Sequence, residues 1–186
     1  MRRILIAMLV LTLLLSASAP AVTKVKNTDH SGFYVGFGIG FGNLGIDFNN
    51  TDVTFDREGG GAGVIFLGGA LKPNLLLGLD VNAWTRKDDN VTRTISTSSL
   101  CLTYYATPRF FVKGGVGVGS ADVEVEYHHS TVSYNETGFG LTAGAGMEFR
   151  LTRHFALVPS TQWSYQSLDS FKSNVFSITF SVGWFW

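Results

Sequence analysis

The residue types of a hydrolytic site occur together at His128, His129 and Ser130, with Glu136 six residues later. Hydrolases of several classes activate a serine with a histidine that a carboxylate orients. Here the residues fall in a polar stretch without the alternating apolar positions that would hold them in place. Two adjacent histidines also lack the i, i+2 or i, i+4 partners of a zinc site. We therefore expect a solvated loop, with no catalytic residues and no metal site.

Composition narrows the kind of protein. The chain has 186 residues, the size of one domain, and 45% of them are hydrophobic. Its 14 Lys and Arg balance 14 Asp and Glu, so no sequence-wide positive field predicts a nucleic-acid partner. Cys101 is the only cysteine and is interpreted as a small buried residue. An excess of Gly (22) and of aromatic residues (13%) favours strands in close contact, and nothing in the sequence predicts a cofactor.

The N-terminus has the layout of a secretory signal peptide. Arg2 and Arg3 precede an apolar run at residues 4–15 and small residues at 16–21. The run is shorter than the roughly 20 residues that a membrane-spanning helix needs. We expect cleavage after Ala21, so that residues 1–21 are the signal peptide and 22–186 form one exported domain. Since no other stretch is long and apolar enough for a spanning helix, a membrane location requires a closed barrel.

Alternation of large apolar with small residues predicts strands. It is clearest in residues 33–42, where Phe and other large residues at odd positions alternate with Gly. In residues 138–151, Glu148 and Arg150 share the small-residue face, so the apolar face is expected to point outward and the other face into a lumen. The uniformly apolar segment 60–71 does not reveal its faces. The eight predicted strands are about 33–42, 60–71, 75–85, 95–106, 110–122, 138–151, 155–166 and 174–186.

The connections between these segments alternate in length. Those at 72–74, 107–109 and 152–154 are short, and those at 43–59, 86–94, 123–137 and 167–173 are long and polar. Short turns on one side and longer loops on the other are typical of outer-membrane barrels, whose short side is periplasmic. The predicted fold is all-β, an eight-stranded antiparallel up-and-down transmembrane β-barrel.

The chain from Phe33 to Trp186 resembles the eight-stranded outer-membrane β-barrel family, which includes the OmpA transmembrane domain, OmpX-like proteins and opacity-type porins. The resemblance implies a Gram-negative outer-membrane protein in contact with membrane lipid and lipopolysaccharide. His128-x-Ser130 is similar to the His-x-Ser pair of a PagL-type lipid A deacylase, but the glutamate spacing differs. The family usually ends in Phe, so Trp186 departs from the pattern. The most specific motif looks like the family's C-terminal insertion signal, which the barrel-assembly machinery reads: Phe180, Val182, Trp184 and Trp186.

Charged residues on the inward face predict a network in the lumen, because an eight-stranded barrel is only wide enough for side chains to fill it. Lys113 and Glu148 each lie four residues from the expected periplasmic ends of neighbouring strands, which predicts an ion pair between them. Asp80 and Arg150 are expected within reach. An unpaired buried charge costs several kcal/mol, so pairing is expected. The pair either plugs or gates the lumen, and we favour the plug. The candidates to fill the volume left by inward glycines are Tyr34, Trp84 and Phe185.

Together these features predict an integral outer-membrane barrel without catalysis, with a structural, envelope-stabilising or surface-interaction role. The alternative is a small-solute porin or a hydrophobic-ligand conduit of the OmpW type. A soluble eight-stranded carrier similar to lipocalins also fits the strand count, but the Gly-x-Trp signature is missing near the mature start. An extracellular partner would contact the loops, in the first place 43–59.

Overall fold

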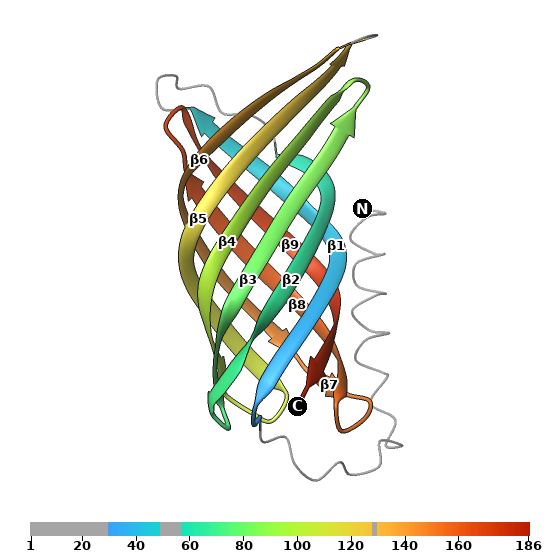
Figure 1. Cartoon of the computed structure of the whole chain (residues 1–186), viewed down its shortest axis with the longest axis vertical. Helices are drawn as coiled ribbons and strands as arrows, with labels where there is room; N and C mark the ends of the chain where they lie inside the picture. The colour runs from blue at the N-terminus through green and yellow to red at the C-terminus, as the bar shows by residue number, and fades with distance from the viewer. Residues whose placement is uncertain (1–29, 49–56, 128–129) are drawn as a thin grey trace, which may run out of the picture.

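The computed structural model describes residues 30–48, 57–127 and 130–186, which form one antiparallel sheet rolled into a barrel (Figure 1). The predicted signal peptide and His128–His129 lie outside the described residues. Among the described residues, no helix is long and apolar enough to cross a membrane. The strands are β1 (Phe33–Phe48), β2 (Glu58–Lys72), β3 (Leu75–Asp88), β4 (Val91–Tyr105), β5 (Phe110–Tyr127), β6 (Ser130–Met147), β7 (Phe149–Arg150), β8 (Phe155–Ser167) and β9 (Phe171–Phe185).

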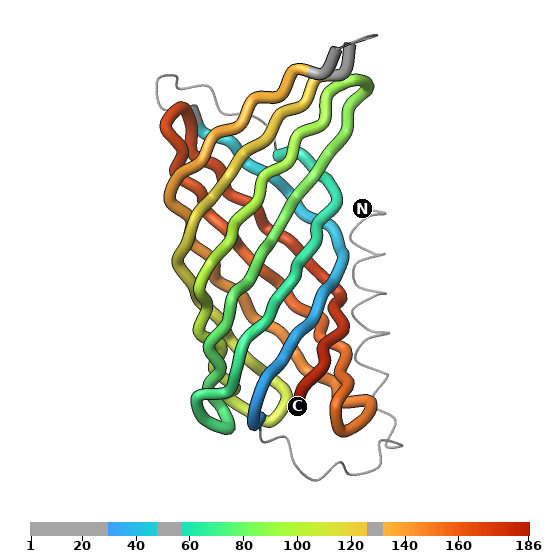
Figure 2. Tube along the Cα trace, viewed as in Figure 1, coloured from blue at the N-terminus to red at the C-terminus, as the bar shows by residue number. Residues whose placement is uncertain are grey.

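Strands from β1 to β6 each pair with the next along the chain, β8 pairs with β9, and β1 pairs with β9 to close the barrel (Figure 2). β7 continues β6 beyond Glu148, and both pair with β8, so the barrel has eight antiparallel strands as predicted. A path that starts at Tyr34 and passes from each residue to its partner on the next strand returns to β1 at Leu44. The strands are therefore staggered by ten residues over one circuit of the barrel. With ordinary strand spacings, this stagger gives a tilt of about 40° and a Cα radius of about 8 Å. Inward side chains fill a cylinder of that size.

The predicted faces are confirmed. On β1, Ile39 and Phe41 are 77% and 82% exposed on the outside of the barrel, while Tyr34 points inward and is buried. The structure also decides the faces of β2, where Val64 and Phe66 point into the lumen and Ile65 is exposed. Exposed apolar side chains thus form a belt around the outside of the barrel, as lipid contact requires.

The two ends of the barrel differ. The turn end carries the connections 73–74, 106–109 and 151–154, together with the described chain ends at 30 and 186. At the opposite end, called here the hairpin end, β3–β4 and β5–β6 continue as long hairpins, and β5–β6 rises furthest (Figure 1). Most of the predicted long connections 86–94, 123–137 and 167–173 are therefore strand, and this part of the prediction is wrong. Beyond the belt the outward positions are polar, as at Asp122 and Asn135, and the apolar positions change to the opposite face, as at Val123 and Tyr134, while the backbone pairing continues.

Apolar side chains point into the lumen near each of its ends and form two clusters. The turn-end cluster consists of Tyr34, Leu76, Tyr105, Phe111, Ala156, Val158 and Phe185, with Phe66 and Ala70 packed against it. The hairpin-end cluster consists of Leu44, Trp84, Ile95, Ala121, Leu168 and Val175, with Ile46 and Phe171 packed against it. Tyr34, Trp84 and Phe185 fill the lumen, as predicted. Polar side chains occupy the level between the two clusters.

Candidate functional site

The mouth of the lumen at the turn end is closed around Glu148, whose side chain is 1% exposed. Its carboxylate accepts hydrogen bonds from the Tyr105 hydroxyl at 2.5 Å and from Arg150 Nε. His30, which precedes β1, places Nε2 3.0 Å from Glu148 Oε2 and Nδ1 3.1 Å from the carbonyl oxygen of Pro73. Four distant parts of the chain therefore meet across this opening.

Aromatic rings complete this closure. The His30 ring lies 4.1 Å from the Tyr105 ring and 5.4 Å from the Phe185 ring, measured between centroids. The Arg150 guanidinium lies 4.1 Å above the Phe185 ring, a cation–π contact. We call His30, Tyr105, Glu148, Arg150 and Phe185 the mouth cluster. Because its charged groups are paired and its rings contact one another at tilted angles, it spans the opening without an unpaired buried charge.

Deeper in the lumen, Lys113 Nζ lies 2.5 Å from Asp80 Oδ2, and both side chains are under 10% exposed. The predicted pair of Lys113 with Glu148 is wrong, because Lys113 is paired with Asp80 and Glu148 with Arg150 and His30. The prediction placed Lys113 and Glu148 at the same depth, whereas the strands place Lys113 opposite Gly144. This register difference of four residues moves Glu148 roughly 13 Å along the strand, to the mouth.

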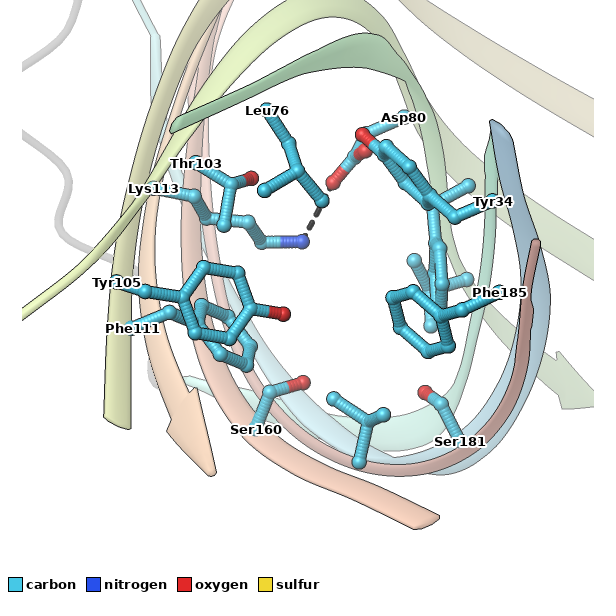
Figure 3. A pocket seen from close by; sticks show the side chains of 13 residues that line it. Tyr34, Leu76, Asp80, Thr103, Tyr105, Phe111, Lys113, Ser160, Ser181 and Phe185 are labelled. Atoms are coloured by element: carbon cyan, nitrogen blue, oxygen red, sulfur yellow. Dashed lines mark hydrogen bonds and ion pairs between the residues drawn. The ribbon is translucent and has the colours of Figure 1, made fainter. Parts of the chain in front are cut away.

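The Asp80–Lys113 pair lines a cavity with about 470 Å³ of space not filled by atoms, part of it open to solvent (Figure 3). Figure 3 shows the lining side chains pointing inward from the barrel wall around a central space. Aromatic and aliphatic side chains such as Tyr34, Phe111 and Phe185 form much of the wall, and Thr103, Ser160 and Ser181 supply hydroxyl groups. Ser181 Oγ is buried without a protein partner, so water is the natural occupant of this space.

Polar side chains that hydrogen-bond to one another fill the lumen between the two apolar clusters. Gln166 Nε2 donates to Thr97 Oγ1 at 2.6 Å, and Ser173 Oγ donates to Gln166 Oε1 at 2.7 Å. The Ser99 and Thr142 hydroxyls lie 3.0 Å apart, and the thiol of Cys101 lies 3.3 Å from each of them. Cys101 is 1% exposed and is a buried residue, as predicted.

Glycines on the inward face make room for these side chains. A Cβ at Gly119 would lie 2.6 Å from Gln166 Cγ, and one at Gly140 would lie 2.8 Å from Thr97 Cγ2. Neighbouring side chains therefore occupy the volume that the glycines leave.

Charged residues at the hairpin end form a separate exposed network. Arg93 bridges Glu58 and Asp88, at 3.0 and 2.9 Å, and Arg86 Nε also lies 2.8 Å from an Asp88 oxygen. The hydrogen bond from Arg86, followed by those from Arg93, lowers the pKa of Asp88 below its usual value. This network links the start of β2 to the β3–β4 hairpin outside the apolar belt.

Among the four residues whose types would suit a hydrolytic site, Glu136 has a described side chain. It is buried and accepts a hydrogen bond from the backbone N–H of Ser170 at 2.6 Å. It therefore holds the β8–β9 turn. Among the residues with described positions, no three His, Cys, Asp or Glu side chains gather in a way that could hold a metal ion.

The residues of the predicted insertion signal share the outward face of β9. Phe180 and Trp186 are 58% and 59% exposed, and Trp184 stacks on Phe37 and meets Phe155 edge-on. The Trp186 N–H donates to the Phe33 carbonyl, so the strand is paired to its end. Recognition of this strand by the assembly machinery remains a prediction.

Sequence reasoning missed His30 and Tyr105. Tyr105 lies at an inward position at the end of a predicted strand, and strand parity could have identified it. His30 precedes the first alternating segment, so no periodic signal marks it.

The closed barrel, its outward apolar belt and its filled lumen can be compared with known proteins. The family model of the outer membrane protein beta-barrel domain matches residues 7–183. The chain belongs to this family. It is an eight-stranded outer-membrane barrel, and the family locates it in the outer membrane of a Gram-negative bacterium. No curated protein matches the sequence.

Solved structures share the fold at low identity. Neisserial surface protein A (NspA) has 15% identity and a TM-score of 0.62, over 84% of this chain and 98% of its own. Ail, the attachment invasion locus protein of Yersinia pestis, has 12% identity and a TM-score of 0.58, over 83% and 98%. OprG from Pseudomonas aeruginosa has 12% identity and a TM-score of 0.50, over 86% and 98%. At these identities the likeness concerns the fold alone.

Proposed function

We propose that this chain is a non-catalytic outer-membrane barrel with a closed lumen, which stabilises the envelope and displays its hairpin end to the outside. The observation that carries the proposal is the filling of the lumen at three levels. The mouth cluster closes the turn end, hydrogen-bonded polar side chains fill the middle, and Trp84, 1% exposed, lies in the hairpin-end cluster. An ion crossing this barrel would have to displace all three.

The hairpin end supports the surface-interaction part of the proposal. On the protruding β6 strand, Val132 and Tyr134 are 58% and 56% exposed, beyond the level at which the lumen is filled. Exposed apolar side chains on a protruding hairpin are suited to contact with another macromolecule. In this proposal lipid and lipopolysaccharide surround the belt, and the barrel-assembly machinery reads the end of β9.

The cavity beside Asp80 and Lys113 favours a second candidate, passage of small solutes or hydrophobic ligands. It would need the mouth cluster to open. Single-channel recording in planar bilayers distinguishes the two functions. Protein that is shown to be folded by its mobility shift on boiling should give no conductance steps. Stable steps from the folded protein would overturn the closed-lumen proposal in favour of a pore.

A further inference from the structure

Each of the three connections at the turn end carries one exposed cation. These are Lys72 at the end of β2, Arg109 before β5 and Arg153 before β8. None of them makes an ion pair with another described residue. The connections alternate with strand pairs around the barrel, so the three charges are distributed around its rim.

Each cation lies beside the edge of the apolar belt. Lys72 follows Leu71, which is 58% exposed, and Arg109 precedes Phe110, which is 39% exposed. Arg153 comes two residues after Leu151, which is 56% exposed. At the same end, Trp184 and Trp186 point outward. Aromatic side chains at the edge of a belt lie at the level of lipid headgroups, so the neighbouring cations lie at the level of the phosphates.

No described acidic side chain on the exposed surface of this end opposes them. Asp80 and Glu148, in the half of the lumen nearest this end, are buried and paired. The other described acidic side chains lie toward the hairpin end: Asp47, Glu58, Asp88, Asp89, Asp122, Glu124, Glu136 and Asp169. Among the described residues the barrel is therefore polarised, since the exposed charged side chains of the turn-end rim are all cationic.

We propose that Lys72, Arg109 and Arg153 form a collar that binds the phosphate groups of anionic phospholipids in the leaflet facing the periplasm. Short turns of family barrels face the periplasm, which places the collar there. Arginine donates paired hydrogen bonds to phosphate, and lysine acts as a point charge. Because the cations border the belt, a lipid already packed against Leu71, Phe110 or Leu151 presents its headgroup to them.

Quenching of tryptophan fluorescence by brominated lipids tests the collar. A Trp163→Phe background removes the outward tryptophan on β8, Trp84 stays shielded in the lumen, and Trp184 and Trp186 report on lipids at the turn end. Trp184 pairs with Phe155 and therefore lies close to the connection that carries Arg153. Trp186 contacts Phe33 and lies close to the connection that carries Lys72. The binding constant of brominated phosphatidylglycerol is measured relative to brominated phosphatidylcholine in mixed vesicles.

In low salt, the background protein should bind phosphatidylglycerol severalfold more tightly than phosphatidylcholine. The triple variant Lys72→Gln, Arg109→Gln and Arg153→Gln should lower this ratio about fivefold, the equivalent of ~1 kcal/mol for a cation near an anionic surface. High salt should lower the ratio of the background protein and leave that of the triple variant unchanged. The matched control removes three cations from the hairpin end: Arg57→Gln, Lys87→Gln and Lys172→Gln.

An unchanged ratio in the triple variant, or an equal fall in the control variant, would overturn the proposal. Co-sedimentation with purified peptidoglycan tests the other source of anions. If the triple variant lost binding to peptidoglycan while its lipid ratio stayed the same, the collar would serve the cell wall and the lipid proposal would be wrong. The mobility shift on boiling verifies that each variant is folded, so a folding defect is distinguished from a loss of lipid selectivity.

Discussion

Removing one charge of the Asp80–Lys113 pair should destabilise the barrel more than removing both. The two atoms are 2.5 Å apart, and both side chains are almost fully buried. At an effective dielectric constant of about 20, two unit charges at this distance attract by about 7 kcal/mol, most of which the loss of hydration offsets. A single replacement leaves the other charge buried without its partner.

Breaking a buried pair costs about 3–5 kcal/mol, and we expect the lower value because the adjoining cavity admits water. Asp80→Asn and Lys113→Met should each lower the free energy of unfolding by about 3 kcal/mol. The double variant should lose about 1 kcal/mol or less, so the coupling energy between the two side chains should be about 5 kcal/mol.

Urea unfolding of the barrel in lipid vesicles, followed by tryptophan fluorescence and by gel mobility, measures these free energies. The control is Arg86→Gln, which breaks a pair with Asp88 whose side chains are 36% and 40% exposed. Exposed pairs contribute little to stability, so this variant should remain close to the wild type. A coupling energy below about 0.5 kcal/mol between Asp80 and Lys113 would refute the reasoning, since the two charges would then act independently.

Four further variants test the packing of the lumen and the closure of its mouth. Trp84→Ala should cost about 3–5 kcal/mol in urea unfolding, because it empties the hairpin-end cluster, and a loss under 1 kcal/mol would contradict that packing. Gly38→Ala should cost about 1–3 kcal/mol, since its Cβ would lie 2.7 Å from the Ser181 Cα. Gly61→Ala should be close to neutral, because its Cβ would meet nothing closer than 3.8 Å, and equal losses at both glycines would argue against the inward packing. His30→Ala should open the mouth and speed labelling of Cys101 by a small thiol reagent at least about tenfold over the nearly unreactive wild type. Unchanged labelling would show that the mouth cluster does not control access.

Much of the architecture follows from the sequence because a lipid-facing barrel imposes a period of two. Ile39 and Phe41 must face lipid, so their neighbours Gly38 and Gly40 must face the lumen, and the same reasoning places Glu148 and Arg150 inside. Prediction failed where lipid no longer acts on the outward face. Around Asp122 and Asn135 the outward face is polar and apolar residues such as Val123 lie on the opposite face, so the pattern of large outward residues that marks the belt no longer identifies the strand.

The sequence by itself determined that the chain forms a barrel, which residues face outward on most strands, and that Lys113, Glu148, Asp80 and Arg150 share the lumen. Only the tertiary structure decided which of these charges meet. Odd or even position along a strand fixes the face of a residue, but its depth in the barrel depends on the register between strands. The register differs by four residues from the predicted one, so Lys113 pairs with Asp80 and not with Glu148. His30 shows the same limit, since a residue outside any strand joins the mouth cluster through contacts that no local pattern encodes.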